Sequence, residues 1–146
     1  MMQDKAMKWA LWAVAAMGAA LLAAAALSAE EAPERAATKA ASDWLALVDA
    51  GRYGASWNEA ASLFKQQVTA EQWKTALTNV RQPLGALQSR KLVSARYTKS
   101  VPGAPDGEYV VIAFETVFEN KKAAVETITP MKEKDGSWRV SGYFIH

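Results

Sequence analysis

The stretch that decides the fold is Tyr109-Val110-Val111-Ile112-Ala113-Phe114-Glu115-Thr116-Val117-Phe118. Its bulkier residues recur at every second position, which is the pattern of a β-strand with one buried face. We expect a strand over residues 108–120. The side chains expected on its buried face are Val110, Ile112, Phe114, Thr116 and Phe118.

Three further segments show weaker forms of the same pattern: residues 87–99, 123–133 and 137–145. Lys121-Lys122 is expected to form the tight turn before the third strand. Asp135-Gly136 has the composition of a type I′ hairpin turn before the fourth. The sequence therefore predicts a four-stranded antiparallel meander.

These two-residue turns also predict which side chains share a face. They pair Phe118 with Val125 and Thr127 with Phe144. The inner face would then hold Ile112, Phe114, Thr116, Phe118, Val125, Thr127, Thr129, Met131, Trp138, Val140 and Phe144. The outer face would hold Glu115, Val117, Glu126, Ile128, Lys132, Arg139, Tyr143 and Ile145. On that face Glu115 and Glu126 are expected to belong to a solvated row of charges.

Helical signals precede the strands. Apolar residues at helical spacing begin at residue 37, and Gly51 is suited to end that helix. Two capping boxes, Ser56 with Glu59 and Thr69 with Gln72, predict the starts of a second and a third helix. The fold class expected is α+β, with three helices packed on one face of the sheet.

The first thirty residues resemble an export signal. Lys5 and Lys8 precede an uncharged, Ala-rich stretch at residues 9–27, and the small residues Ser28 and Ala29 follow it. This layout predicts a cleaved signal peptide over residues 1–29, a lead-in over residues 30–36 and a single domain over residues 37–146. The expected location is periplasmic or secreted. The alternative is an inner-membrane anchor formed by residues 9–27.

Composition excludes several classes of function. The 146 residues include 17 basic and 15 acidic side chains, a net charge of +2, which gives no electrostatic basis for binding nucleic acid. No Cys is present, and His146 is the single His. Disulfides, thiolate catalysis, the usual Ser-His-Asp triad and multi-His metal sites are thereby excluded, and we expect no metal or cofactor.

Several short motifs together resemble a family of exported bacterial proteins, the domain of unknown function 4019. They include Trp44-Leu45-Ala46-Leu47-Val48-Asp49-Ala50-Gly51-Arg52-Tyr53, Arg81-Gln82-Pro83-Leu84-Gly85 and Gly136-Ser137-Trp138-Arg139-Val140-Ser141-Gly142-Tyr143. The resemblance implies no activity, cofactor or catalytic residue. Its helix-then-sheet order is similar to the cone-shaped roll of the nuclear transport factor 2-like (NTF2-like, or cystatin-like) superfamily, which includes isomerases, dehydratases and non-catalytic binding proteins.

Two arginines are candidates for binding an anionic ligand. Arg81 and Arg90 flank the connection between the last helix and the sheet, and guanidinium groups suit carboxylate or phosphate. The alternative is that they form structural pairs, either with helix-end carbonyls or with an acid such as Asp49.

Three other residues are candidates for lining a ligand cavity in the roll. Thr116 and Thr127 are expected on the inner face, where their hydroxyls would face a ligand. Trp57 would offer a stacking surface. The alternatives are ordinary cross-strand pairing for the threonines and a hydrophobic staple at the start of a helix for Trp57.

The outer face carries apolar side chains that predict an interface with a second copy or with another protein. The candidates are Tyr109, Val117, Ile128 and Tyr143. The alternative is that the lead-in segment covers them.

Two classes of function stay open. The favoured one is a non-catalytic module outside the inner membrane that binds a small ligand or a protein partner. The alternative is a small enzyme of the isomerase or dehydratase type with an apolar substrate in the cone. The expected inner face contains no acid apart from Glu133 at its end, which argues against acid–base catalysis.

Overall fold

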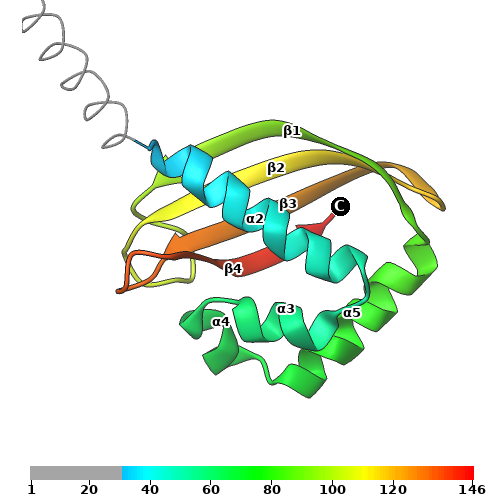
Figure 1. Ribbon diagram of the computed structural model, residues 1–146, viewed down its shortest axis with the longest axis horizontal. Coiled ribbons are helices and arrows are strands. Elements are labelled where there is room, and N and C mark those ends of the chain that lie inside the picture. The colour runs from blue at the N-terminus through cyan, green and yellow to red at the C-terminus, as the bar shows by residue number, and fades with distance from the viewer. Residues whose placement is uncertain (1–30) are drawn as a thin grey trace, which may run out of the picture. The chain divides into compact units, whose positions relative to one another are not determined.

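The computed structural model describes residues 31–146, so the predicted signal peptide lies outside the described residues (Figure 1). Four helices precede four strands in that part of the chain. The helices are α2 (Pro33–Asp49), α3 (Tyr53–Glu59), α4 (Ser62–Gln67) and α5 (Ala70–Leu84). The strands are β1 (Leu87–Thr98), β2 (Tyr109–Phe118), β3 (Lys121–Lys132) and β4 (Trp138–Ile145).

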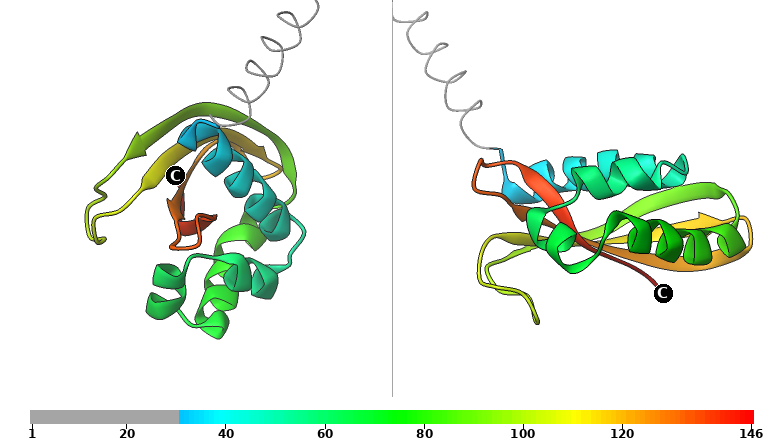
Figure 2. Two further views of the ribbon diagram at one scale, coloured as in Figure 1. Left: turned by 60° about the vertical axis from the view of Figure 1, so that its left-hand side comes forward. Right: turned by 90° about the horizontal axis from the view of Figure 1, so that it is seen from below.

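The four strands form one antiparallel sheet in the order β1-β2-β3-β4. The sheet curls, and α2 lies across its concave side, with α3, α4 and α5 beyond β4 (Figures 1 and 2). The α+β class with an open antiparallel sheet is confirmed. We call the side facing α2 the inner face and the opposite side the outer face.

The main core lies between α2, α5 and the inner face. From α2 it receives Trp44 and Leu45, and from β2 it receives Val110, Ile112 and Phe114. The period-two pattern of β2 therefore predicted its buried side correctly. This core lies wholly within Pro33–His146, which forms one compact unit. None of the helices described in this unit is long and apolar enough to cross a membrane.

The first described helix differs from expectation at its start. It begins at Pro33, so residues 33–36 form its first turn rather than a lead-in. Proline suits this position because the first helical N–H groups have no partner within the helix. The helix ends before Gly51, as predicted, and the φ of +75° at that residue is readily accessible to glycine.

The second predicted helix is wrong in its start and in its length. Ser56 is buried inside α3 rather than capping a helix, and its hydroxyl accepts a hydrogen bond from Trp73 Nε1 at 3.0 Å. Ala60 and Ala61 adopt extended backbone and separate α3 from α4. This extended segment is bound to the sheet, because the Ala61 N–H donates to the Val140 carbonyl of β4 at 2.8 Å. The third predicted helix begins at the Thr69–Gln72 capping box, as predicted.

The predicted turn between β2 and β3 is wrong. The chain reverses at Glu119-Asn120, and Phe118 pairs with Lys121. Tertiary contacts explain the choice, since Asn120 N–H donates to the Leu84 carbonyl at 2.9 Å and its side-chain amide donates to the Pro83 carbonyl at 3.1 Å.

The new turn alone moves the pairing by four residues, and the bulge between Thr116 and Phe118 takes one of them back, so the net change over most of β3 is three. A change by an odd number of residues exchanges the two faces of the strand. Ala124, Glu126 and Ile128 therefore lie on the inner face and are buried. Val125 and Thr127 lie on the outer face instead of the inner one.

The connection between β3 and β4 is one residue longer than predicted. Glu133 N–H donates to the Ser137 carbonyl, which leaves three residues in the loop, and Gly136 has a φ of +86°. A bulge beside Pro130 compensates, so Thr127 still pairs with Phe144. Val140 is buried on the inner face as predicted, whereas Phe144 lies on the outer face and is 64% exposed.

Candidate functional site

A fully buried carboxylate lies at the centre of the inner face. Glu126 is 0% exposed, although the sequence pattern predicts it in a solvated row of charges. Its Oε1 accepts from Arg90 Nε at 2.7 Å and from the Thr116 hydroxyl at 2.6 Å. Its Oε2 accepts from Arg90 Nη2 at 3.2 Å and from the Tyr143 hydroxyl.

A second carboxylate, Asp49 at the end of α2, extends this group of residues. Its Oδ2 accepts from Arg90 Nη1 at 2.7 Å, and its Oδ1 accepts from Arg90 Nη2 at 3.0 Å and from Arg81 Nη2 at 2.9 Å. The Arg81 guanidinium also lies 4.9 Å from the centre of the Phe118 ring. We call Asp49, Arg81, Arg90, Thr116, Glu126 and Tyr143 the buried cluster.

The buried cluster joins six elements of the fold. It takes one residue from each of α2, α5, β1, β2, β3 and β4. Its two guanidinium groups balance its two carboxylates, which is the condition under which charges are tolerated away from water. The cluster therefore fixes how the C-terminal ends of the two long helices meet the sheet.

Hydrogen bonds within the cluster favour the charged forms of Asp49 and Arg90. Burial alone would raise the pKa of Asp49, but hydrogen bonds from Arg90 and Arg81 outweigh it and hold this pKa below its ordinary value. Burial would lower the pKa of Arg90, but its bonds to Asp49 and Glu126 raise it instead. Burial and the Glu126 charge raise the pKa of the Tyr143 hydroxyl, which keeps this group a donor.

This arrangement limits what the cluster can do chemically. The two oxygens of Glu126 accept four hydrogen bonds, which fills the usual acceptor capacity of a carboxylate. A general base needs a lone pair directed at a substrate proton. Glu126 has none available, so its geometry is that of a structural carboxylate.

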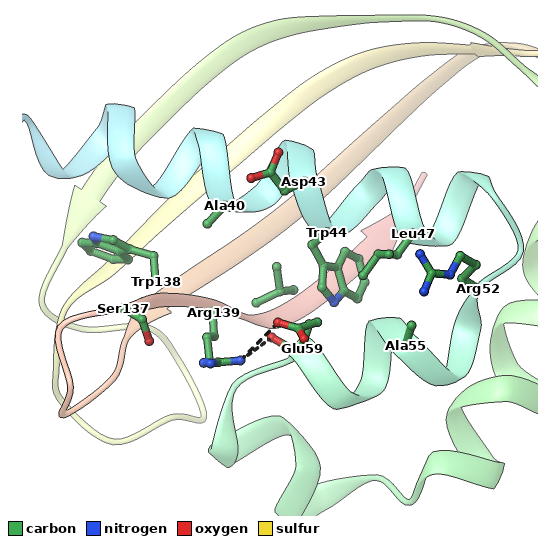
Figure 3. A pocket seen from close by; sticks show the side chains of 11 residues that line it. Ala40, Asp43, Trp44, Leu47, Arg52, Ala55, Glu59, Ser137, Trp138 and Arg139 are labelled. Carbon is green, nitrogen blue, oxygen red and sulfur yellow. Dashed lines mark hydrogen bonds and ion pairs between the residues drawn. The ribbon is translucent and has the colours of Figure 1, made fainter.

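An open groove of about 540 Å³ lies outside the cluster, between α2, α3 and β4 (Figure 3). This volume falls within the range of small-molecule sites, roughly 300–1,000 Å³. Trp44 and Trp138 contribute aromatic surface, and Ala40, Leu47 and Ala55 contribute apolar surface. Trp44 is held in place because its Nε1 donates to the Ser56 carbonyl at 2.8 Å.

The rim of the groove carries four charged side chains, Asp43, Glu59, Arg52 and Arg139. Arg139 Nη1 lies 3.5 Å from Glu59 Oε2 across the groove (Figure 3). Asp43 pairs with Lys39 on the same helix at 2.8 Å. Arg52 is exposed and forms no ion pair with any residue of 31–146, so its donors are available to a ligand.

The structure brings together three of the five predicted ligand residues. Arg81, Arg90 and Thr116 all belong to the buried cluster, and Asp49 is the partner of both arginines, in agreement with the structural alternative. Thr127 lies apart from them, half-buried on the outer face.

Trp57, the fifth predicted ligand residue, is also separate from the cluster and does not line the groove. Its Nε1 donates to the Val68 carbonyl at 2.7 Å, and the Lys65 ammonium lies 5.8 Å from the centre of its ring. These contacts tie α3 to the end of α4.

The predicted interface residues do not share one surface. Ile128 is buried in the core, and Tyr143 is half-buried on the inner face, so their outer-face placement is wrong. The causes are the bulge between Thr116 and Phe118, which exchanges the faces of β3, and the bulge beside Pro130. Tyr109 is 1% exposed, and its hydroxyl donates to the Pro105 carbonyl at 2.6 Å. Val117 is half-buried on the outer face.

Sequence reasoning missed the groove because its lining comes from three elements that meet only in the folded chain. The strand pattern assigns Trp138 to the core and Arg139 to the outer face. Apart from its position directly after Gly51, nothing in the sequence around Arg52 marks it as a residue of a ligand site. Among residues 31–146, no three metal-ligating side chains converge.

The fold and the groove define a small α+β domain with a charge-neutral buried cluster and an open groove that has charged side chains on its rim. The chain belongs to the DUF4019 family, described as protein of unknown function, whose model matches residues 40–143. A comparison with curated proteins finds no match.

Proposed function

We propose that this protein is an exported, non-catalytic binding module and that the groove between α2, α3 and β4 is its ligand site. The observation that supports this most directly is the Arg52 guanidinium, which forms no ion pair within residues 31–146 and lies at one end of a groove of about 540 Å³ with aromatic walls. The export component rests on the signal-like composition of residues 1–29. We also propose that the domain has the cone-shaped NTF2-like fold, because its helices precede its strands in the chain.

The choice of a binding module over an enzyme rests on the state of the buried acids. Glu126 is saturated with hydrogen bonds and does not line the groove. Asp49 already receives three donors from two arginines. The isomerase or dehydratase alternative needs an acid that is free to act on the substrate, and neither of these buried acids faces the groove. The two acids on the groove rim, Asp43 and Glu59, are each engaged in an ion pair.

The lining suggests the class of ligand. Trp44, Trp138 and Leu47 favour a flat or elongated apolar body, and Arg52 favours an anionic group at one end of it. The remaining three rim charges are engaged with protein partners. We therefore propose a small amphipathic organic anion.

Two related probes test this proposal with residues 31–146, whose core is self-contained. Anilinonaphthalene sulfonate has an aromatic body and a sulfonate, and N-phenyl-1-naphthylamine has a similar body without the charge. We expect Arg52→Ala to weaken binding of the sulfonate by about three- to ten-fold and to leave the neutral probe unaffected.

A second pair of variants tests the location of the site. Ala40→Phe would fill the groove and is expected to abolish binding of both probes. Ala46→Phe is the matched control, because Ala46 is exposed on the same helix and does not line the groove. Unchanged binding of both probes by Ala40→Phe would refute the groove as the site. Native mass spectrometry of the domain purified from its own periplasm would then identify any retained ligand.

A further inference from the structure

A second hollow adjoins the ligand groove, between the α3–α4 segment and the turn that joins β3 to β4. Its volume is about 720 Å³, within the range of small-molecule sites, roughly 300–1,000 Å³. Every side chain that lines it is charged or carries an amide or a hydroxyl group. We call this hollow the polar recess, in contrast to the groove with its aromatic walls.

The groove and the polar recess meet at one ion pair. Glu59 and Arg139 line both of them, and Arg139 Nη1 lies 3.5 Å from Glu59 Oε2 (Figure 3). The Glu59 side chain is 64% exposed and the Arg139 side chain is 35% exposed. An ion pair this exposed contributes little to stability, so polar groups of a ligand can replace the contact at little cost. The two hollows can therefore hold two parts of one ligand.

The charges around the polar recess cancel. Three acidic and three basic side chains line it, namely Glu59, Glu133 and Asp135 with Lys65, Lys134 and Arg139. Neither sign is in excess, so the recess has no net attraction for an ion. Two of its acids are engaged with the protein, since Glu133 accepts from the Ser62 N–H at 2.8 Å and Asp135 accepts from the Ser137 hydroxyl at 2.6 Å. A neutral polar group therefore suits the recess better than a charged one.

Two side-chain amides of the polar recess are available to such a group. Asn58 on α3 and Gln66 on α4 are exposed, and neither side chain forms a hydrogen bond with another residue of 31–146. An amide offers both donors and an acceptor, and a hydroxyl group likewise both donates and accepts. Several hydroxyl groups on one ligand could therefore bind both amides at once.

We propose that the polar recess binds a neutral polyhydroxylated group, of the sugar-ring class, carried by the same ligand whose apolar body occupies the groove. This inference rests on the proposed function of the groove. The two environments are directly adjoining, because Trp138 lines the groove and the next residue, Arg139, lines both hollows. The ligand class is thereby narrowed from an amphipathic anion to one that also bears a sugar-like group.

Aromatic glycosides test the polar recess with residues 31–146. The 4-methylumbelliferyl glycosides of glucose, galactose and N-acetylglucosamine share a flat body with 7-methoxy-4-methylcoumarin, which has no sugar. Fluorescence titration measures the dissociation constant of each compound. We expect at least one glycoside to bind about three- to ten-fold more tightly than the methoxycoumarin, because its hydroxyl groups add hydrogen bonds in the recess.

A double variant tests where the sugar lies. Asn58→Ala combined with Gln66→Ala is expected to remove the advantage of the glycoside and to leave binding of the methoxycoumarin unchanged, since neither residue lines the groove. Gln67→Ala is the matched control, because Gln67 is an exposed amide on the same helix and does not line the recess. An advantage that survives the double variant would place the sugar elsewhere and overturn the proposal.

The anilinonaphthalene sulfonate measurement separates this inference from the proposed function. If Ala40→Phe abolishes binding of the sulfonate, glycosides that bind no more tightly than the methoxycoumarin overturn the polar recess as a subsite and leave the groove intact. If Ala40→Phe leaves binding of the sulfonate and of every coumarin unchanged, the groove is refuted and the inference falls with it. A glycoside whose binding survives Ala40→Phe, while that of the methoxycoumarin is lost, would show that the two hollows do not share one ligand and would overturn the proposal.

Discussion

Two groups of four charges, each with one Asp, one Glu and two Arg, differ completely in their surroundings. The buried cluster contains Asp49, Glu126, Arg81 and Arg90, and seven hydrogen bonds tie these charges to one another and to Thr116 and Tyr143. The groove rim contains Asp43, Glu59, Arg52 and Arg139, and its ion pairs are mostly exposed to solvent.

The difference teaches that burial, and not residue type, decides the role of these charges. Inside the protein a charge that loses its partner suffers a large desolvation penalty, so the cluster behaves as one structural unit. At the rim water replaces a lost partner at little cost, so the charges can exchange protein partners for a ligand.

The largest effect is expected for Glu126→Ala, which leaves Arg90 with one carboxylate and leaves the Thr116 and Tyr143 hydroxyls without an acceptor. We expect the free energy of unfolding to fall by about 3–5 kcal/mol, the usual cost of breaking a buried ion pair. Urea titration followed by circular dichroism measures it. A loss below about 1 kcal/mol would show that water enters the cluster and replaces the lost carboxylate.

Replacing Arg90 should lower the free energy of unfolding more than replacing Arg81. Arg90 makes four hydrogen bonds to carboxylates, whereas Arg81 makes one, and its Nε and Nη1 are buried without a partner among the described residues. We expect Arg90→Met to cost about 3 kcal/mol and Arg81→Met about 1–2 kcal/mol, because Met can keep the packing on Phe118. Equal losses in urea titrations of the two variants would contradict this ranking.

Asp49 should make stability depend on pH in a defined direction. Its pKa is held below the ordinary value of 3.8, so the folded state binds fewer protons than the unfolded state in this range. Its contribution is complete above about pH 4 and is lost as the pH falls through the lowered pKa. We expect Asp49→Asn to be about 1–3 kcal/mol less stable at pH 7 and to approach the wild type as the pH falls toward about 2. A difference that stays constant over this whole range, from about pH 7 to about pH 2, would rule out this role for the carboxylate.

The smallest effect is expected at the groove rim. Glu59→Gln breaks the pair with Arg139 but leaves both side chains in contact with water. We expect the free energy of unfolding to change by less than about 0.5 kcal/mol. A loss as large as that of Glu126→Ala in the same urea titration would erase the contrast between the two groups.

Local pattern was enough to predict most of the elements. The alternation in β2 identified the central strand and its buried side, and the Thr69–Gln72 capping box identified the start of α5. The pairing of Arg81 with Asp49 was also predictable, because the sequence offered it as the alternative to ligand binding by Arg81. The interruption between α3 and α4 at Ala60-Ala61 was not predictable, because it depends on a hydrogen bond to β4, a strand about eighty residues later.

The candidate site was less predictable because it depends on register. The pair Lys121-Lys122 resembles a turn as much as Glu119-Asn120 does, and the choice is made by contacts of Asn120 with the end of α5. Gly85 takes part in that choice, since a side chain there would lie 2.9 Å from Glu119. The bulge between Thr116 and Phe118 then makes the net change in register odd, and this moves Glu126 from the predicted solvent side to the centre of the protein.

The sequence by itself determined the α+β class, the number and approximate limits of the strands, and the exclusion of cysteine chemistry, because these depend on composition and on periodicities of a few residues. Tertiary structure alone decided that Glu126 is buried, that Arg52 is available at the groove and that Phe144 is exposed. Each of these depends on how residues distant in sequence meet, and a turn together with one bulge is enough to exchange the inner and outer faces of a strand.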